Sequence, residues 1–112
     1  MTLDDVGQTL EATVVHRGAQ AGGADIRHVA ASDLMSDLLV ADRHGHLLVT
    51  SLASDQAVRT ADIVGAAGLV VVNGKNLPAT MVSLAKELDL TLLRTSLRMF
   101  EACVKLGKAL GA

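Results

Sequence analysis

The chain is almost devoid of aromatic side chains. Among its 112 residues there is no Trp and no Tyr, and Phe100 is the only Phe. Proteins usually hold single-stranded nucleic acid by stacking its bases on aromatic rings, and this chain has no such platform. The formal net charge of −2 gives no attraction toward a phosphate backbone either. We therefore expect no nucleic-acid partner.

Cysteine and long apolar runs are equally scarce. Cys103 is the only cysteine, so no disulfide can form within the chain, and its apolar neighbours favour a buried, unreactive side chain. No apolar stretch reaches the roughly 18 residues that a membrane-spanning helix needs. The acidic first residues lack the pattern of a signal peptide. The expectation is a cytoplasmic protein with no membrane partner.

What the sequence does contain is a regular succession of short apolar runs. Half of the residues are hydrophobic, and the runs 47–49, 69–72 and 90–93 start about 22 residues apart. Each run precedes a helix-like segment, and this alternation is typical of a parallel sheet buried on both faces. The length suits one domain over residues 1–112. The sequence thus predicts an α/β fold, in which helices flank a mainly parallel central sheet.

The helices that follow the runs have recognisable ends. Ser54 or Asp55 would cap a helix that runs to about Ala67, with Gly68 as its stop. Pro78 marks the entry of a second helix, and Ser96 would cap the last one. Shorter patterns predict the first half as a helix over 2–10, strands over 11–15 and 25–30, a loop over 17–24, a helix over 32–42 and a turn at Gly45.

Polar residues follow three of the predicted strands. In open parallel sheets, ligands bind beyond the carboxyl ends of the strands, near helix N-termini that favour anions. These residues are therefore candidates for binding a phosphate or a carboxylate. Loops and helix caps commonly contain the same residue types, so a purely structural role remains open. The candidate binding residues are Thr50, Ser51, Asn73, Gly74, Lys75, Arg94 and Thr95.

Catalytic and cofactor motifs are absent. Gly74-Lys75 is not a P-loop, because position 69 is Leu and position 76 is Asn. The glycines of residues 18–23 do not have the dinucleotide-binding spacing, and no nucleophile elbow occurs. Neither a catalytic residue nor a cofactor is predicted.

Two clusters of titratable residues are predicted to be exposed surface residues and not a metal-binding or catalytic site. Asp42, His44 and His46 lie close in sequence. A metal site normally needs three or four ligands that other residues hold in place, so an exposed turn is predicted here instead of a metal site. Asp33 and Asp37 would lie on the solvated side of a helix capped by Ser32.

Three longer stretches resemble a known family. "SDLMSDLL" at 32–39, "VVVNGK" at 70–75 and "LLRTSLRMFEA" at 92–102, in this order and spacing, are similar to the DRTGG domain, and the resemblance extends over about residues 3–110. Asn73-Gly74 stands where that family has Thr-Gly-Gly. The resemblance implies a fold related to the N-terminal domain of HPr kinase. It also implies a regulatory role, as in modules beside CBS domains in nucleotide-regulated pyrophosphatases, and a homodimer.

Two functions follow from these observations. The first is a non-catalytic, homodimeric regulatory module that senses a small anionic metabolite such as an adenine nucleotide. The second is an interaction or dimerisation domain without a small-molecule ligand, which would dock onto a signalling kinase or a redox protein.

Overall fold

Strands and helices alternate along most of the chain. The computed structural model describes residues 1–40 and 45–111. Its elements are, in chain order, α1 (Leu3–Thr9), β1 (Thr13–His16), the 3-10 helix η1 (Ala21–Gly23), β2 (Val29–Ala31), α2 (Met35–Leu39), β3 (Leu47–Thr50), α3 (Asp55–Val64), β4 (Gly68–Val71), α4 (Ala79–Glu87), β5 (Thr91–Arg94) and α5 (Met99–Ala109).

The strands form one sheet of five, in the order β1-β5-β4-β3-β2. Strands β2 to β5 run parallel to one another, and β1 runs antiparallel to β5 at one edge. Every residue of β3 and β4 is buried. This burial explains why these strands are continuous apolar runs without a polar face. The predicted α/β fold with a mainly parallel central sheet is confirmed.

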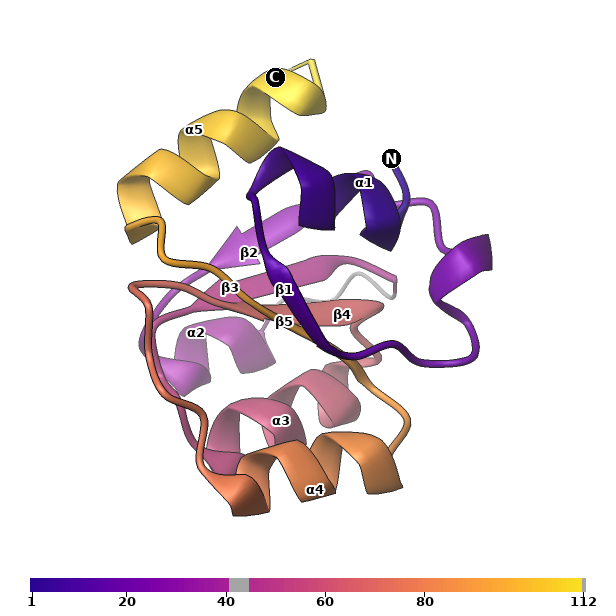
Figure 1. The fold of residues 1–112 in the computed structure, drawn as a ribbon, viewed down its shortest axis with the longest axis vertical. Helices are drawn as coiled ribbons and strands as arrows, with labels where there is room; N and C mark the ends of the chain where they lie inside the picture. Colours follow the sequence, from indigo (N-terminus) through magenta and orange to yellow (C-terminus); the bar gives the residue numbers. More distant parts are fainter. Residues whose placement is uncertain (41–44, 112) are drawn as a thin grey trace.

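Helices cover both faces of the sheet. Figure 1 shows α1 and α5 on one side of the sheet and α2, α3 and α4 on the other. Side chains alternate along each strand: Leu48 packs into the core beneath α3 and α4, whereas Leu47 and Val49 pack into the core beneath α1 and α5. The chain thus builds two cores, one on each side of the sheet.

The connections beyond β4 and β5 leave the sheet on opposite faces. The chain leads from β4 into α4, on the same face as α3, whereas it leads from β5 into α5, on the opposite face (Figure 1). In open α/β sheets, a crevice opens at the carboxyl ends of neighbouring strands whose connections diverge in this way. Here that position lies between Val71 and Arg94, which are partners in the sheet.

Two predicted helix boundaries were wrong. The helix α3 ends at Val64, and Gly65 with a φ of 71° is its left-handed C-cap, whereas Gly68 is buried at the start of β4. A left-handed residue at the helix end favours glycine, and two glycines nearby made the choice ambiguous in sequence. Ser96 does not cap α5, because that helix begins at Met99 after Arg98.

The region before β3 also differs from its prediction. The predicted helix over 32–42 is only the five-residue α2, and Leu34, not Ser32, is its N-cap residue; position 42 lies outside the described residues. The predicted strand over 25–30 is only the short β2, because Ile26 donates its backbone N–H to the carbonyl of Met1. The loop predicted over 17–24 contains η1.

Cys103 lies on α5 and is half-buried, and burial raises the pKa of its thiol. A raised pKa disfavours the thiolate, which is the reactive form. Within the described part of the chain, no helix is long and apolar enough to cross a membrane.

Candidate functional site

The polar ends of β3, β4 and β5 lie along one rim of the sheet. Thr50 pairs with Val71 on the neighbouring strand, and Val71 pairs in turn with Arg94. Because these strands are parallel and in register, Ser51, Asn73 and Thr95 follow at the same edge. The structure therefore brings together the residues that the sequence grouped as a candidate site.

At the β3 end of the rim, the carboxylate of Asp33 accepts hydrogen bonds from Thr50 and Ser51. Its Oδ1 accepts a hydrogen bond of 2.6 Å from the backbone N–H of Ser51 and one of 3.2 Å from the hydroxyl of Thr50. Hydrogen bonds from the side chain and then the backbone of Ser51 are the largest causes that lower the pKa of Asp33 below 3.8. The hydroxyl of buried Thr50 also accepts from the N–H of Leu52.

Asp33 is a rim residue that sequence reasoning missed. The sequence places it on a solvated helix face, but it lies between β2 and α2. Because β2 is parallel to β3, a residue just past β2 reaches the same edge as Ser51. The sequence predicted that the strand ends at residue 30 and that a helix begins at residue 32. Asp33 was therefore assigned to the helix and not to the end of a strand.

The loops beyond β4 and β5 are tied together by backbone hydrogen bonds. The N–H of Asn73 donates to the carbonyl of Leu97 at 2.8 Å, and the N–H of Gly74 donates to the carbonyl of Thr95 at 2.9 Å. Asn73 and Gly74 have φ values of 69° and 63°, a left-handed pair that these residue types tolerate best. These two N–H groups are therefore occupied within the protein.

Two cationic residues lie at this part of the rim. The Nε of Arg94 donates to the carbonyl of Lys75 at 3.1 Å, so the guanidinium lies against the loop that carries the lysine. Lys75 is exposed, and its charge contributes to the lowered pKa of Asp33. Lys75 and Arg94 thus place two cations at the ends of β4 and β5.

A small pocket opens beside these residues. It has a volume of about 160 Å³ and is lined by Glu11, Thr13, Gly74, Arg94, Thr95 and Ser96. Ligand pockets for drug-sized molecules usually measure about 300–1,000 Å³. This pocket therefore has room for one phosphate or carboxylate group, and the remainder of a larger ligand would lie outside it.

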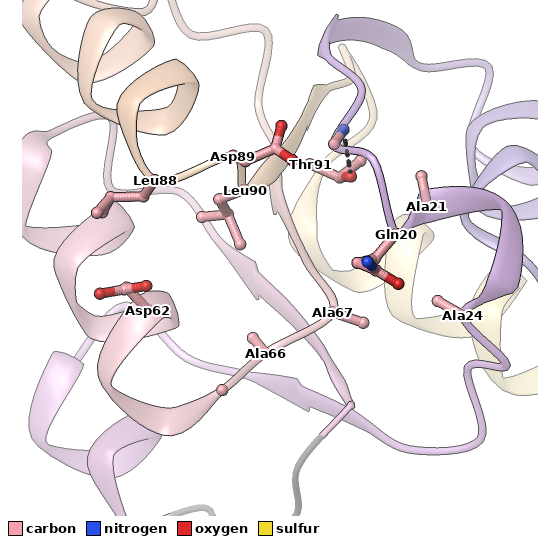
Figure 2. Close-up of a pocket in the computed structure, with 12 residues that line it drawn as sticks. Gln20, Ala21, Ala24, Asp62, Ala66, Ala67, Leu88, Asp89, Leu90 and Thr91 are labelled. Carbon is pink, nitrogen blue, oxygen red and sulfur yellow. Dashed lines mark hydrogen bonds between the residues drawn. The ribbon is translucent and has the colours of Figure 1, made fainter.

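A second pocket lies at the opposite edge, where β4 and β5 begin (Figure 2). Its volume is about 210 Å³, and Figure 2 shows Gln20 on one side of it and Asp62 on the other. Its lining contains two carboxylates and neither Lys nor Arg. One of them, Asp89, accepts a hydrogen bond from the N–H of Ala19, the largest cause that lowers the pKa of this aspartate. The rim pocket, by contrast, is lined by one cation, Arg94, and one carboxylate, Glu11, and Gly74 in its lining is followed directly by Lys75.

His46 differs from its prediction. It is 2% exposed, and neither ring nitrogen has a hydrogen-bond partner among the residues that the structure describes, so it is a buried side chain and not part of an exposed turn. His44 and Asp42 lie outside the described residues. Within the ranges 1–40 and 45–111, no group of three or more His, Cys, Asp or Glu side chains is arranged to hold a metal ion.

The fold resembles that of a solved regulatory protein. No protein-family model matches the sequence, and no curated protein matches it. The structure is similar to the CBS and DRTGG domains of the regulatory region of Clostridium perfringens pyrophosphatase, complexed with its activator, diadenosine tetraphosphate. The TM-score is 0.76 at 16% identity, over 94% of this chain and 45% of that chain. The two proteins share a fold. This chain spans less than half of that neighbour.

Proposed function

We propose that this chain is a cytoplasmic, non-catalytic regulatory module that binds a small anionic metabolite, such as an adenine nucleotide, beyond β4 and β5. The observation that carries the proposal is the hydrogen bond from the Arg94 guanidinium to the backbone carbonyl of Lys75, which joins two cationic residues at the point where the two connections diverge. The structural neighbour supports it, since that protein is a regulatory region bound to an adenine-containing polyphosphate.

The two cations would bind the ligand differently. A guanidinium has five N–H donors, and Arg94 uses its Nε on the carbonyl of Lys75 and one Nη, at 3.5 Å, on that of Gly74. Its remaining donors are available to an anionic group in the pocket. The exposed ammonium of Lys75 would add an attraction that weakens as salt concentration rises. Thr50 and Thr95, whose hydroxyls bond within the protein, would support the rim, while Ser51, Asn73 and Gly74 shape its surface.

A thermal-shift experiment tests this proposal. Binding to the native state alone raises stability by about 2.7 kcal/mol at a ligand concentration 100 times the Kd. We expect AMP, ADP, ATP or diadenosine tetraphosphate to raise the melting temperature, and Lys75→Ala to reduce the shift. Lys86→Ala, which removes an exposed cation on α4, is the matched control. No shift with any of these compounds, or an equal loss in both variants, would contradict the proposal.

A second candidate function is an interaction or dimerisation domain without a small-molecule ligand, which would bind a signalling kinase, a redox protein or a second copy of itself. The specific observation in its favour is Phe100, the only aromatic residue, whose side chain is 79% exposed. Within either candidate function we propose a homodimer. Light scattering on the purified chain measures this state directly, and a monomer at every concentration would contradict it.

A further inference from the structure

The exposed side of α5 carries a short apolar stripe beside its charged residues. Phe100 is 79% exposed and Val104 is 37% exposed, and their spacing of four residues places them on one side of the helix. Ala102 and Leu106, which pack toward the sheet, are buried. Figure 1 shows α5 at the outside of the molecule. The helix therefore carries a second apolar stripe beside the one that covers the core.

Gly107 lies in the same stripe and has no side chain. A Cβ built at this position would meet nothing within 4 Å, so the space above the backbone is open. Glycine inside a helix costs about 1 kcal/mol relative to alanine. The stripe thus combines an exposed ring at Phe100 with a position at Gly107 that has no side chain, called the recess below, about two helical turns away.

From this shape we propose that the face formed by Phe100, Val104 and Gly107 binds the same face of a second copy, with the two α5 helices antiparallel. When the two-fold axis passes between Cys103 and Val104, Phe100 of one copy lies opposite Gly107 of the other. Each copy then inserts one ring into one recess. A two-fold interface requires this kind of self-complementary surface.

The charges on α5 select the antiparallel arrangement. Glu101 lies in the first turn of the helix, whereas Lys105 and Lys108 lie toward its end. In an antiparallel pair, Glu101 of one copy approaches the lysines of the other, and the helix dipoles also oppose each other. A parallel pair would lose these contacts and would place the helix dipoles side by side in the same direction. The second copy is therefore complementary in charge as well as in shape.

The extent of the face predicts a weak dimer. A helix of 11 residues is about 16 Å long, so its one face buries less than the 1,200–2,000 Å² of standard stable interfaces. The dimer should therefore dissociate on dilution. This inference rests on the homodimer proposed above, but not on the nucleotide site.

Sedimentation velocity on the full chain over a range of concentrations tests the face. We expect a monomer–dimer equilibrium whose Kd rises at least tenfold in Phe100→Ala and also in Gly107→Leu, which fills the recess. Leu34→Ala is the matched control, because it removes another exposed side chain, 60% exposed, at the start of α2, which lies on the opposite side of the sheet from α5 (Figure 1). Its Kd should not change. Circular dichroism verifies that each variant is folded.

The possible results separate the two proposals. A wild-type chain that stays monomeric at all concentrations overturns both the homodimer and this interface. If Phe100→Ala and Gly107→Leu leave the Kd of the dimer unchanged, the proposal that α5 forms the interface is overturned, whereas the proposal of a homodimer stands. If Leu34→Ala raises the Kd of the dimer as much as the α5 variants do, the assignment of the interface to α5 is also overturned. The nucleotide response, measured separately by thermal shift, is unaffected by any of these outcomes.

Discussion

The side-chain hydroxyl of Thr95 donates a hydrogen bond of 2.7 Å to the backbone carbonyl of Leu10, the C-cap residue of α1. The same hydroxyl accepts from the N–H of Leu97 at 3.2 Å, and both Thr95 and Leu10 are buried. This one side chain therefore joins the end of β5 to the first helix. The O–H of Thr95 is thus used to hold the rim and is not available to donate to an anionic ligand.

Replacing Thr95 with Val should therefore destabilise the fold. The substitution keeps the size of the side chain but leaves the carbonyl of Leu10 without this buried donor, which costs about 1–3 kcal/mol. Urea unfolding of the variant and of the wild type measures the difference. The nucleotide-induced thermal shift should persist in the variant. An unchanged free energy of unfolding would show that the bond between Thr95 and Leu10 contributes little.

The sequence predicted the rim because the rim depends on local pattern. The buried runs that become β3, β4 and β5 are continuous and apolar, so the polar residues that end them are visible one strand at a time. The partners Asp33 and Leu10 were missed because they come from distant segments, and nothing near Thr50 or Thr95 in the sequence identifies them. The choice between Gly65 and Gly68 as the end of α3 depended on backbone dihedral angles that composition does not give.

Gly18 should tolerate no side chain. A Cβ at this position would lie 2.4 Å from the backbone carbonyl oxygen of Asp89, while the N–H of Gly18 donates to the hydroxyl of Thr91 at 2.9 Å. We expect Gly18→Ala to lower the free energy of unfolding by about 1–3 kcal/mol, because the backbone must move to relieve the overlap. Chemical denaturation measures this change.

The matched control is Gly23→Ala. A Cβ at Gly23 would meet nothing within 4 Å, and no left-handed φ is required there. The control should be neutral or slightly stabilising. Similar losses in both variants would show that the close approach to Asp89 is not the cause.

Asp33 should make part of the stability dependent on pH. Its pKa is lowered in the folded state, first by the hydrogen bonds from Ser51, so its contribution is present above 3.8 and is lost as pH falls through the folded-state value. Asp33→Asn removes the charge and should cost about 1 kcal/mol at neutral pH, less than the roughly 1.5–3 kcal/mol usual for hydrogen bonds to charged groups, because Asp33 is exposed and solvent screens its charge. Urea unfolding at about pH 7 and about pH 3 checks whether the gap between the two proteins narrows in acid.

The comparison with the asparagine variant isolates Asp33 from other acidic groups. Asp4, Asp25 and Asp89 also have lowered pKa values, so the wild type and the variant share their loss of stability in acid. Only the difference between the two proteins reports on Asp33. A gap that stays constant from neutral to acidic pH would argue against a charge effect at this position.

Removing the side chain of Arg94 should change both stability and nucleotide binding, whereas removing that of Lys75 should change binding alone. Its guanidinium donates to the carbonyls of Lys75 and Gly74, at 3.1 Å and 3.5 Å, so it holds the loop as well as facing the pocket. We expect Arg94→Ala to lower the free energy of unfolding by about 0.5–1.5 kcal/mol and to reduce the nucleotide-induced shift. Lys75→Ala should reduce the shift and leave the stability almost unchanged, because its exposed ammonium has no comparable role in the fold. Thermal shift and urea unfolding on both variants measure the two effects separately. If Arg94→Ala loses stability but keeps the full nucleotide response, Arg94 belongs to the fold alone and the anion binds elsewhere.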